Sequence, residues 1–157
     1  MVQQLPDAEV MFRTWALAQS EISSLVGTRI ATRLPNGGTL PFLTVSQLGG
    51  APSADEALIY EANLFIDAYG GKYGSTGSKG QPDYAQAYDL ASKTIANCFD
   101  TTPKKYTSTG GEVATIHGFN NITGPSRIEE PELGLARYNI EVVMIYGALV
   151  LLSLMDQ

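Results

Sequence analysis

The stretch Leu58–Ala68, LIYEANLFIDA, alternates between two kinds of residue. The apolar set occupies every second position: Leu58, Tyr60, Ala62, Leu64, Ile66 and Ala68. The intervening set contains Glu61, Asn63 and Asp67 and is largely polar. Side chains of a strand point alternately to opposite faces, so this pattern predicts a strand with one buried face. One buried face and one polar face together are typical of an antiparallel sheet.

A second stretch, Leu135–Tyr146, has the same period of two. Its apolar set is Tyr138, Ile140, Val142, Met144 and Tyr146. We predict that this set shares the buried face of the sheet with Leu64 and Ile66, beneath the helices. Three more segments are predicted as strands: Thr28–Leu34, Leu40–Leu48 and Glu112–Phe119. Loops are predicted at Gly70–Gln81, Asp100–Gly111 and Asn120–Gly134.

Two segments have helical spacing. The first has apolar residues three or four positions apart, after the start signals Pro6 and Asp7 and before the stop signal Gly27: Met11, Trp15, Ala18, Ile22 and Leu25. The second begins at Pro82, which suits a first helical position, and has an apolar stripe from Tyr84 to Phe99 that includes Cys98. We therefore predict an α+β fold: a mostly antiparallel sheet of four to five strands with two helices on one face. Residues 1–157 are predicted to form a single domain.

Composition excludes several classes of protein. The chain has 157 residues, of which 44% are hydrophobic, so it is not disordered. Its net charge of −6 makes it a poor candidate for clamping nucleic acid, because phosphate contacts need Lys and Arg. One cysteine and one histidine exclude a disulfide framework and a Cys-rich zinc site. We expect no signal peptide, because the first ten residues, MVQQLPDAEV, have no basic n-region and no apolar h-region. We expect no membrane association, because the most apolar stretch, Val142–Met155, is shorter than the roughly 20 residues of a membrane span.

No group of residues has the pattern of a catalytic or cofactor site. The loop Gly70–Gly80 lies between a strand and a helix, but Lys79 is followed by Gly80, so the phosphate-loop pattern fails. Cys98 falls on an apolar stripe, where core packing is its expected role. His117 lies on a short strand, and the sequence has no Gly-x-Ser-x-Gly motif beside which it could act. We expect no catalytic residue, no cofactor and no metal.

Three surface segments have ordinary interpretations. The acidic run Glu129, Glu130 and Glu132 does not match a calcium loop and is expected to be solvated. Lys104 and Lys105 are too few for a nucleic-acid patch, and the sequon Asn121-Ile122-Thr123 matters only in a secreted protein. The C-terminal tail is different, because residues 148–155, ALVLLSLM, are too apolar to be left in water. We expect this tail to be buried either in the subunit's own core or, preferably, against a neighbouring protein.

Two groups of short motifs resemble a known family. The first group is Gly27-Thr28-Arg29-Ile30, Arg33-Leu34-Pro35, Leu40-Pro41-Phe42-Leu43-Thr44-Val45 and Gly49-Gly50. The second group is Gly124-Pro125, Glu130-Pro131-Glu132-Leu133-Gly134 and Ala136-Arg137-Tyr138, which leads into the strand Asn139–Tyr146. Together with the order of elements, they resemble the tail terminator proteins of bacteriophages with long, flexible, non-contractile tails.

The resemblance implies a structural role in a virion without catalysis. Tail terminators form a hexameric ring on the head-proximal end of the tail tube, stop tube polymerisation and offer the surface that joins the filled head. Implied partners are further copies of the chain, the tail tube protein and a head-completion or neck protein. DNA passes through the ring without specific binding, and assembly takes place in the host cytoplasm.

The resemblance also suggests roles for two sets of residues. An acidic lumen is expected, with Glu129, Glu130 and Glu132 as its residues. The apolar tail, residues 148–157, is expected to contact a neighbouring subunit through Leu149, Leu151, Leu152, Leu154 and Met155. Three alternatives remain open: another phage neck or head-completion connector, a non-viral small α+β ligand-binding domain, and a hydrolase that uses His117 or Cys98.

Overall fold

A computed structural model describes residues 5–35, 38–53, 56–73, 81–100, 102–129 and 134–148. The helices within these ranges are α1 (Ala8–Ala18), α2 (Ser20–Val26) and α3 (Tyr84–Cys98). The strands are β1 (Ile30–Ala31), β2 (Phe42–Ser53), β3 (Glu56–Gly70), β4 (Lys72–Tyr73), β5 (Gln81–Pro82), β6 (Lys104–Thr107), β7 (Val113–Ile128) and β8 (Ala136–Ala148).

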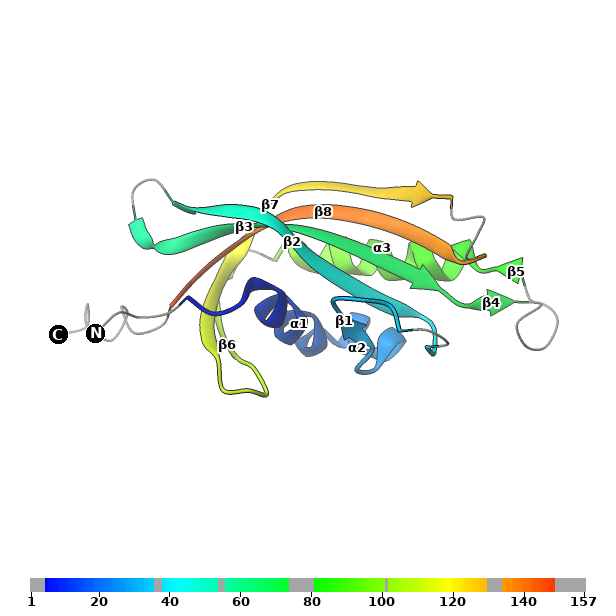
Figure 1. Cartoon of the computed structure of the whole chain (residues 1–157), viewed down its shortest axis with the longest axis horizontal. Coiled ribbons are helices and arrows are strands. Elements are labelled where there is room, and N and C mark those ends of the chain that lie inside the picture. The colour runs from blue at the N-terminus through cyan, green and yellow to red at the C-terminus, as the bar shows by residue number, and fades with distance from the viewer. Residues whose placement is uncertain are drawn as a thin grey trace.

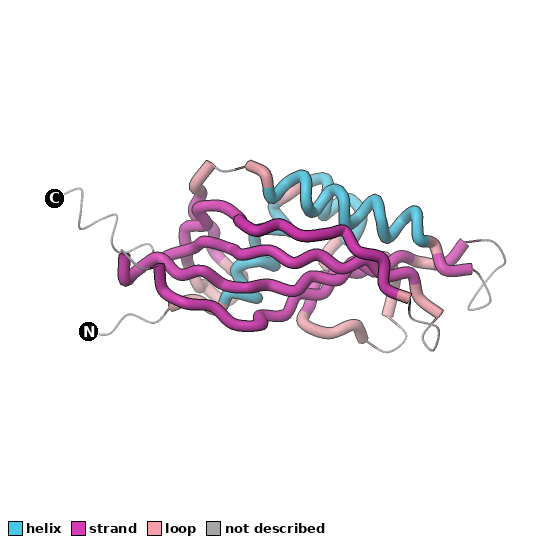
Figure 2. The backbone as a smooth tube through the Cα atoms, turned by 90° about the horizontal axis from the view of Figure 1, so that it is seen from above, coloured by secondary structure: helices cyan, strands magenta, loops and turns pink. Residues whose placement is uncertain are grey.

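Six strands form one curved sheet in the order β1-β2-β3-β8-β7-β6. All neighbours in it are antiparallel except β1 and β2, which are parallel. The helices lie on one side of the sheet (Figure 1), and α3 runs alongside the long strands (Figure 2). Strands β4 and β5 pair only with each other. The α+β class was therefore predicted correctly from the sequence.

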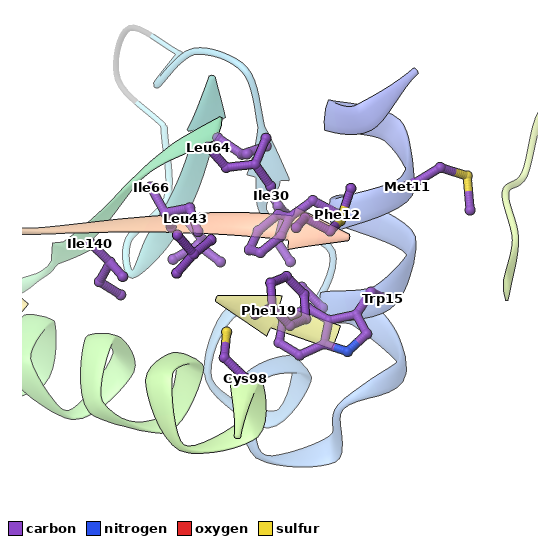
Figure 3. Packing of buried hydrophobic residues seen from close by; sticks show 14 of the residues in the cluster. Met11, Phe12, Trp15, Ile30, Leu43, Leu64, Ile66, Cys98, Phe119 and Ile140 are labelled. Carbon is purple, nitrogen blue, oxygen red and sulfur yellow. The ribbon is translucent and has the colours of Figure 1, made fainter. Parts of the chain in front are cut away.

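The buried face of the sheet is the predicted one. Leu64 pairs with Val142, and Ile66 pairs with Ile140 on the neighbouring strand. All four side chains are at most 2% exposed, and Tyr138 lies half-buried on the same face. These strands contribute to a single hydrophobic core that also takes residues from all three helices (Figure 3). The alternating pattern in the sequence identified this face because one face of each strand packs against helices.

Each long helix begins at an aspartate. The Asp7 carboxylate accepts hydrogen bonds from the backbone N–H groups of Glu9 and Val10, at 2.8 and 3.3 Å. The Asp83 carboxylate accepts one from Gln86 N at 3.0 Å. These bonds satisfy backbone donors that a first helical turn leaves without a helical partner. The helix α3 begins at Tyr84, so the prediction that Pro82 is its first residue was wrong. Pro82 belongs to β5 and precedes the helix by two residues.

The first predicted helix is two helices, so the chain has three helices and not two within its described ranges. Gln19 separates α1 from α2 with an extended backbone, φ −87° and ψ 112°. The break changes the direction of the chain, yet Ile22 of α2 remains as fully buried as Met11 of α1. The spacing predicted which residues are buried, but continuous apolar spacing did not reveal the break.

The sheet is larger than predicted. Lys104–Thr107 forms the edge strand β6 where a loop was expected, and β7 continues through Asn120 to Ile128 instead of ending at Phe119. Strand β2 likewise continues through Gly49 and Gly50, beyond its predicted end at Leu48. Register shifts at these points absorb residues that do not fit a regular strand.

Glycine allows one of these departures from regular geometry, in the second half of β7. Gly124 of β7 has φ +111°, and a Cβ there would lie 2.6 Å from the carbonyl oxygen of Asn139. Only a residue without a side chain fits so close to a neighbouring backbone. Gly147 does not end β8, because it pairs with Ile59 on one side and Thr115 on the other.

Candidate assembly surfaces

The two residues considered for catalysis lie on different elements, Cys98 at the end of α3 and His117 in β7. Cys98 is buried in the core near Phe119 (Figure 3), and burial raises the pKa of its thiol from 9.0 to about 12. A nucleophilic cysteine needs a lowered pKa, so the shift has the wrong direction for that role. His117 is half-buried in β7 beside a register shift between Ile116 and Gly118. Within the described ranges, no group of three or more His, Cys, Asp or Glu side chains could hold a metal ion.

The loop considered for phosphate binding begins and ends in a short hairpin. Lys72 pairs with Pro82, and Tyr73 pairs with Gln81. The Gln86 side chain accepts a hydrogen bond from Gly71 N at 2.6 Å, which ties the start of the hairpin to α3. Residues 74–80 lie outside the described residues, so the expectation for the rest of this loop stays a prediction.

The acidic residues expected in a lumen are placed only in part. Glu129 is exposed, but its carboxylate accepts a hydrogen bond from Arg127 Nε at 2.9 Å and another from the Tyr84 hydroxyl at 3.3 Å. A cation therefore offsets the charge of Glu129. Glu130 and Glu132 lie outside the described residues, and so do the tail residues Leu149, Leu151, Leu152, Leu154 and Met155.

Aromatic side chains gather where α3 meets the ends of β7 and β8. Tyr138 of β8 lies edge-to-face with both Tyr84 and Tyr88 of α3, with ring centroids 6.4 and 5.4 Å apart. The Arg127 guanidinium lies over the Tyr84 ring, 3.6 Å from its centroid. Tyr88 is 51% exposed, so this cluster is open to solvent on the α3 side. Tyrosine and arginine are enriched at the energetic centres of protein interfaces.

The face of the sheet without helices carries an ion pair near one end. Arg137 donates from Nε and Nη2 to the two oxygens of Asp67, each at 3.0 Å. The Asn139 side chain donates to Asp67 Oδ1 and to the carbonyl of Ile66, each at 3.2 Å. Asp67 and Asn139 are both under 9% exposed, although they belong to the polar set of the pattern. The polar set is thus partly buried through mutual hydrogen bonds.

Further along, the same face is open and acidic. Glu61 of β3 and Glu141 of β8 are exposed there, in the region where Asn63 and Val143 pair. A shallow groove of about 400 Å³ crosses the strands at this point, and Leu48, Asn63, Asn121 and Val143 are among the residues that line it. The face therefore combines carboxylates with uncharged side chains.

Two exposed apolar side chains mark the two edges of the long strands. Leu48 of β2 is 66% exposed, and Phe99, which directly follows α3, is 67% exposed. Phe99 borders a hollow of about 270 Å³ whose other lining residues are Cys98, Phe119, Asn120, Asn121 and Ile122. Phe99 was predicted to belong to the apolar stripe of the second helix, but it follows the end of α3 and is exposed, and Leu48 was predicted only as the end of a strand. The position of Leu48, an apolar residue next to two glycines in a strand, was the signal in the sequence that could have indicated an exposed side chain. Its exposure, however, depends on the register shift between Gln47 and Gly49.

An open cleft of about 750 Å³ lies at the end of the molecule where β8 finishes. Its lining includes Asp7, Glu112, Tyr60 and Tyr146. The Tyr146 hydroxyl donates to the Pro6 carbonyl at 3.0 Å, and burial raises its pKa to about 12. The acidic groups near it, Asp7 and Glu112, also favour the protonated phenol.

Across the described part of the chain, no helix is both long and apolar enough to cross a lipid bilayer.

Comparison with solved structures finds a likeness in fold. No protein-family model matches the sequence, and no curated protein matches it. The structure is similar to a chain in a solved virion of a native gene transfer agent particle, with a TM-score of 0.53 and 14% sequence identity. The match covers 90% of this chain and 93% of that chain. At this identity the likeness establishes a shared fold that extends over nearly the whole of both chains.

Proposed function

We propose that this chain is a structural protein of a virion. The observation that carries the proposal is the shared fold with a virion chain, which spans nearly the full length of both proteins. More specifically, the protein acts as a tail terminator: a homohexameric ring that caps the tail tube, ends its polymerisation and presents the surface for head joining. Its partners are then its own copies, the tube protein and a head-completion protein, and it is located at the head-proximal end of the tail.

The shape of the subunit suits a ring. A closed ring needs two different lateral surfaces on each subunit, because each copy contacts its neighbours head-to-tail. Among the described residues, the long strands give the sheet two unlike edges, since β2 is bordered only by the short β1 and β7 only by the short β6. An exposed apolar side chain lies beside each edge: Leu48 on β2, and Phe99 after α3, next to β7.

The sheet face without helices suits the wall of a DNA channel. Glu61 and Glu141 are exposed on it, whereas the cation Arg137 is paired with Asp67. Exposed carboxylates repel the phosphates of DNA, so a bore of this kind lets DNA slide without gripping it. The acidic lumen is thus assigned to Glu61 and Glu141 in addition to the predicted Glu129, Glu130 and Glu132.

We also propose that the protein is not an enzyme and needs no cofactor. The supporting observation is the burial of Cys98 with its raised pKa, which leaves the hydrolase alternative without a cysteine nucleophile. A paired substitution, Cys98→Ala with His117→Ala, is expected to leave virion assembly intact.

Another neck or head-completion connector is the second candidate, because the likeness to a virion chain fits any station in the particle. Disruption of the gene in the virus that carries it separates the two functions. A tail terminator is expected to leave tubes of uncontrolled length and unjoined full heads in electron micrographs. Tubes of normal length beside heads that have lost their DNA would favour the head-completion function, and normal particles would contradict both.

A further inference from the structure

We propose that Leu48 of one subunit inserts into the hollow beside Phe99 of the next subunit. The partner is a second copy of this chain, and the contact joins the two edges of the long-stranded part of the sheet. The inference rests on the proposed ring and names the residues that close it.

The two positions lie at the same level of the sheet, on opposite edges. Gly49, directly after Leu48, pairs with Asn63, which pairs with Val143, which in turn pairs with Asn120. At this level the sheet is four strands wide, because β1 pairs only with residues 43–44 of β2 and β6 only with residues 113–116 of β7. Four strands span roughly 14 Å at the usual spacing. A copy placed beside the first therefore meets Asn120 at the height of Leu48.

Leu48 is 66% exposed and borders the groove on the helix-free face. It lies at the register shift between Gln47 and Gly49, so it is not held in the ladder to β3. The Glu9 carboxylate accepts a hydrogen bond from Gln47 N at 2.9 Å, which occupies the strand edge just before Leu48. Side-chain insertion, more than extension of the strand ladder, is therefore the contact that this edge offers.

The opposite edge is shaped as a receptor. The hollow of about 270 Å³ lies between the end of α3 and the edge of β7, and Phe99, Phe119 and Ile122 provide apolar walls. One water molecule takes up about 30 Å³, so the hollow has room for a side chain as large as leucine. Phe99 is 67% exposed in the single subunit, and filling the hollow would cover it.

The lack of charged residues in these segments of β2 and β7 also favours a partner at both edges. Residues 47–53 of β2 and residues 118–126 of β7 contain no charged side chain. Free edges of natural sheets commonly carry charges, especially lysine, which prevent association with another sheet. Two strand segments without charged side chains of their own, one with the exposed Leu48 and one with the hollow, fit a head-to-tail contact that repeats around a ring.

The test uses three charge substitutions at exposed side chains: Leu48→Asp, Phe99→Asp and, as the matched control, Thr109→Asp. Thr109 is exposed in the turn between β6 and β7, outside the proposed contact. Sedimentation velocity and native mass spectrometry give the assembly state, and thermal unfolding checks the fold. We expect each edge variant alone to lose association by at least about tenfold, while the control forms rings like the parent chain.

A mixture of the Leu48→Asp and Phe99→Asp variants gives the decisive test. A chain with Leu48→Asp keeps an intact hollow, and a chain with Phe99→Asp keeps an intact Leu48. An equimolar mixture should therefore form heterodimers of about 34 kDa, twice the 16.8 kDa of one chain, but no rings. If a substitution removes the cooperative thermal transition, Leu48→Ser and Phe99→Ser replace the charged variants.

The outcomes separate this inference from the proposed function. If the parent chain and both edge variants form rings, the proposed Leu48 contact is wrong, whereas the ring proposal still holds. A mixture in which the two variants remain monomers equally overturns the Leu48 contact. If the parent chain itself remains monomeric at every concentration, the ring proposal and this contact both fail.

Discussion

At the scale of single residues, two leucines show how burial sets the role of a side chain. Leu64 is 2% exposed in the core, whereas Leu48 is 66% exposed at a strand edge. Leu64→Ala is expected to lower the unfolding free energy by about 2–5 kcal/mol, through lost burial and the cavity left behind. Leu48→Ala is the matched control and should change monomer stability by less than about 0.5 kcal/mol. Chemical denaturation at low protein concentration measures both, and equal losses would contradict the assignment of the buried face.

Cys98 makes a prediction about pH. Burial raises the pKa of its thiol from 9.0 to about 12, so above pH 9 the unfolded chain releases a proton that the folded chain keeps. The unfolding free energy is therefore expected to be unaffected by this group below pH 9 and to fall by about 1.4 kcal/mol per pH unit above it. Tyr146 adds a similar fall from pH 10, where its pKa is raised from 10.0 to about 12.

Denaturant unfolding across this pH range tests the Cys98 prediction. In a Cys98→Ala variant the fall in unfolding free energy should begin near pH 10, from Tyr146, and no longer near pH 9. A variant that loses stability from pH 9 as steeply as the parent chain would show that the thiol is not shielded in the folded protein.

The role of a residue could be predicted from the sequence where it belongs to a repeating pattern. It could not be predicted where one contact between distant parts of the chain determines the role. The core roles of Leu64, Ile66 and Cys98 followed from periodicity, because many neighbours share the same period. The partnership of Glu129 with Arg127 and Tyr84 did not, since Tyr84 is 45 residues away in the chain. Asp67 was placed on a polar face correctly, but its burial by Arg137 depends on which strands are neighbours.

At the scale of elements, two ion pairs of the sheet differ in how much stability they should supply. Asp67 and Arg137 join β3 to β8 with side chains 9% and 19% exposed, whereas Arg127 and Glu129 lie at the end of β7 with side chains 49% and 70% exposed. A charged hydrogen bond away from water contributes about 1.5–3 kcal/mol, and an exposed pair usually less than about 1 kcal/mol. Asp67→Ala should therefore destabilise the protein more than Glu129→Ala does.

Thermal and chemical unfolding of the two variants measure the comparison. The loss in Asp67→Ala includes the penalty of leaving Arg137 without its carboxylate partner in a half-buried position. A Glu129→Ala variant that proves as unstable as Asp67→Ala would mean that the Asp67 ion pair is as open to water as the pair at Glu129.

Strands were predictable where one side of them packs against helices. Strands β3 and β8 lie in the middle of the sheet and alternate clearly, so their pairing face was evident. Strand β6 lies at an edge and its side chains are mostly exposed, so Lys104–Thr107 has no alternation to detect. The second half of β7 contains Asn121 with φ 51° and Gly124 with φ 111°, conformations typical of turns. Bulges placed these residues inside a strand, and sequence patterns do not reveal bulges.

At the scale of the whole molecule, the charge of the helix-free face should decide how DNA behaves in the ring. Replacing Glu61 and Glu141 together by lysine reverses two exposed charges in each of six copies. If this face lines the channel, the double variant should bind DNA, and this binding should weaken as the salt concentration rises. The parent ring should not retain DNA. Glu21→Lys, an exposed substitution on α2, is the control at the helical side.

A filter-binding or gel-shift measurement with linear DNA reports the difference. Equal DNA retention by the double variant and the Glu21→Lys control would show that the helix-free face does not line the bore. The ring would then have to present another surface to DNA.

We propose that the chain works as a closed ring in a virion, and native mass spectrometry of the purified protein at increasing concentration is the direct test. We expect a discrete assembly of six copies, with a mass of about 101 kDa, and no larger open series, because head-to-tail contacts that close consume both edges of every subunit. A single species of 16.8 kDa at every concentration, or a continuous ladder of ever larger assemblies, would contradict it.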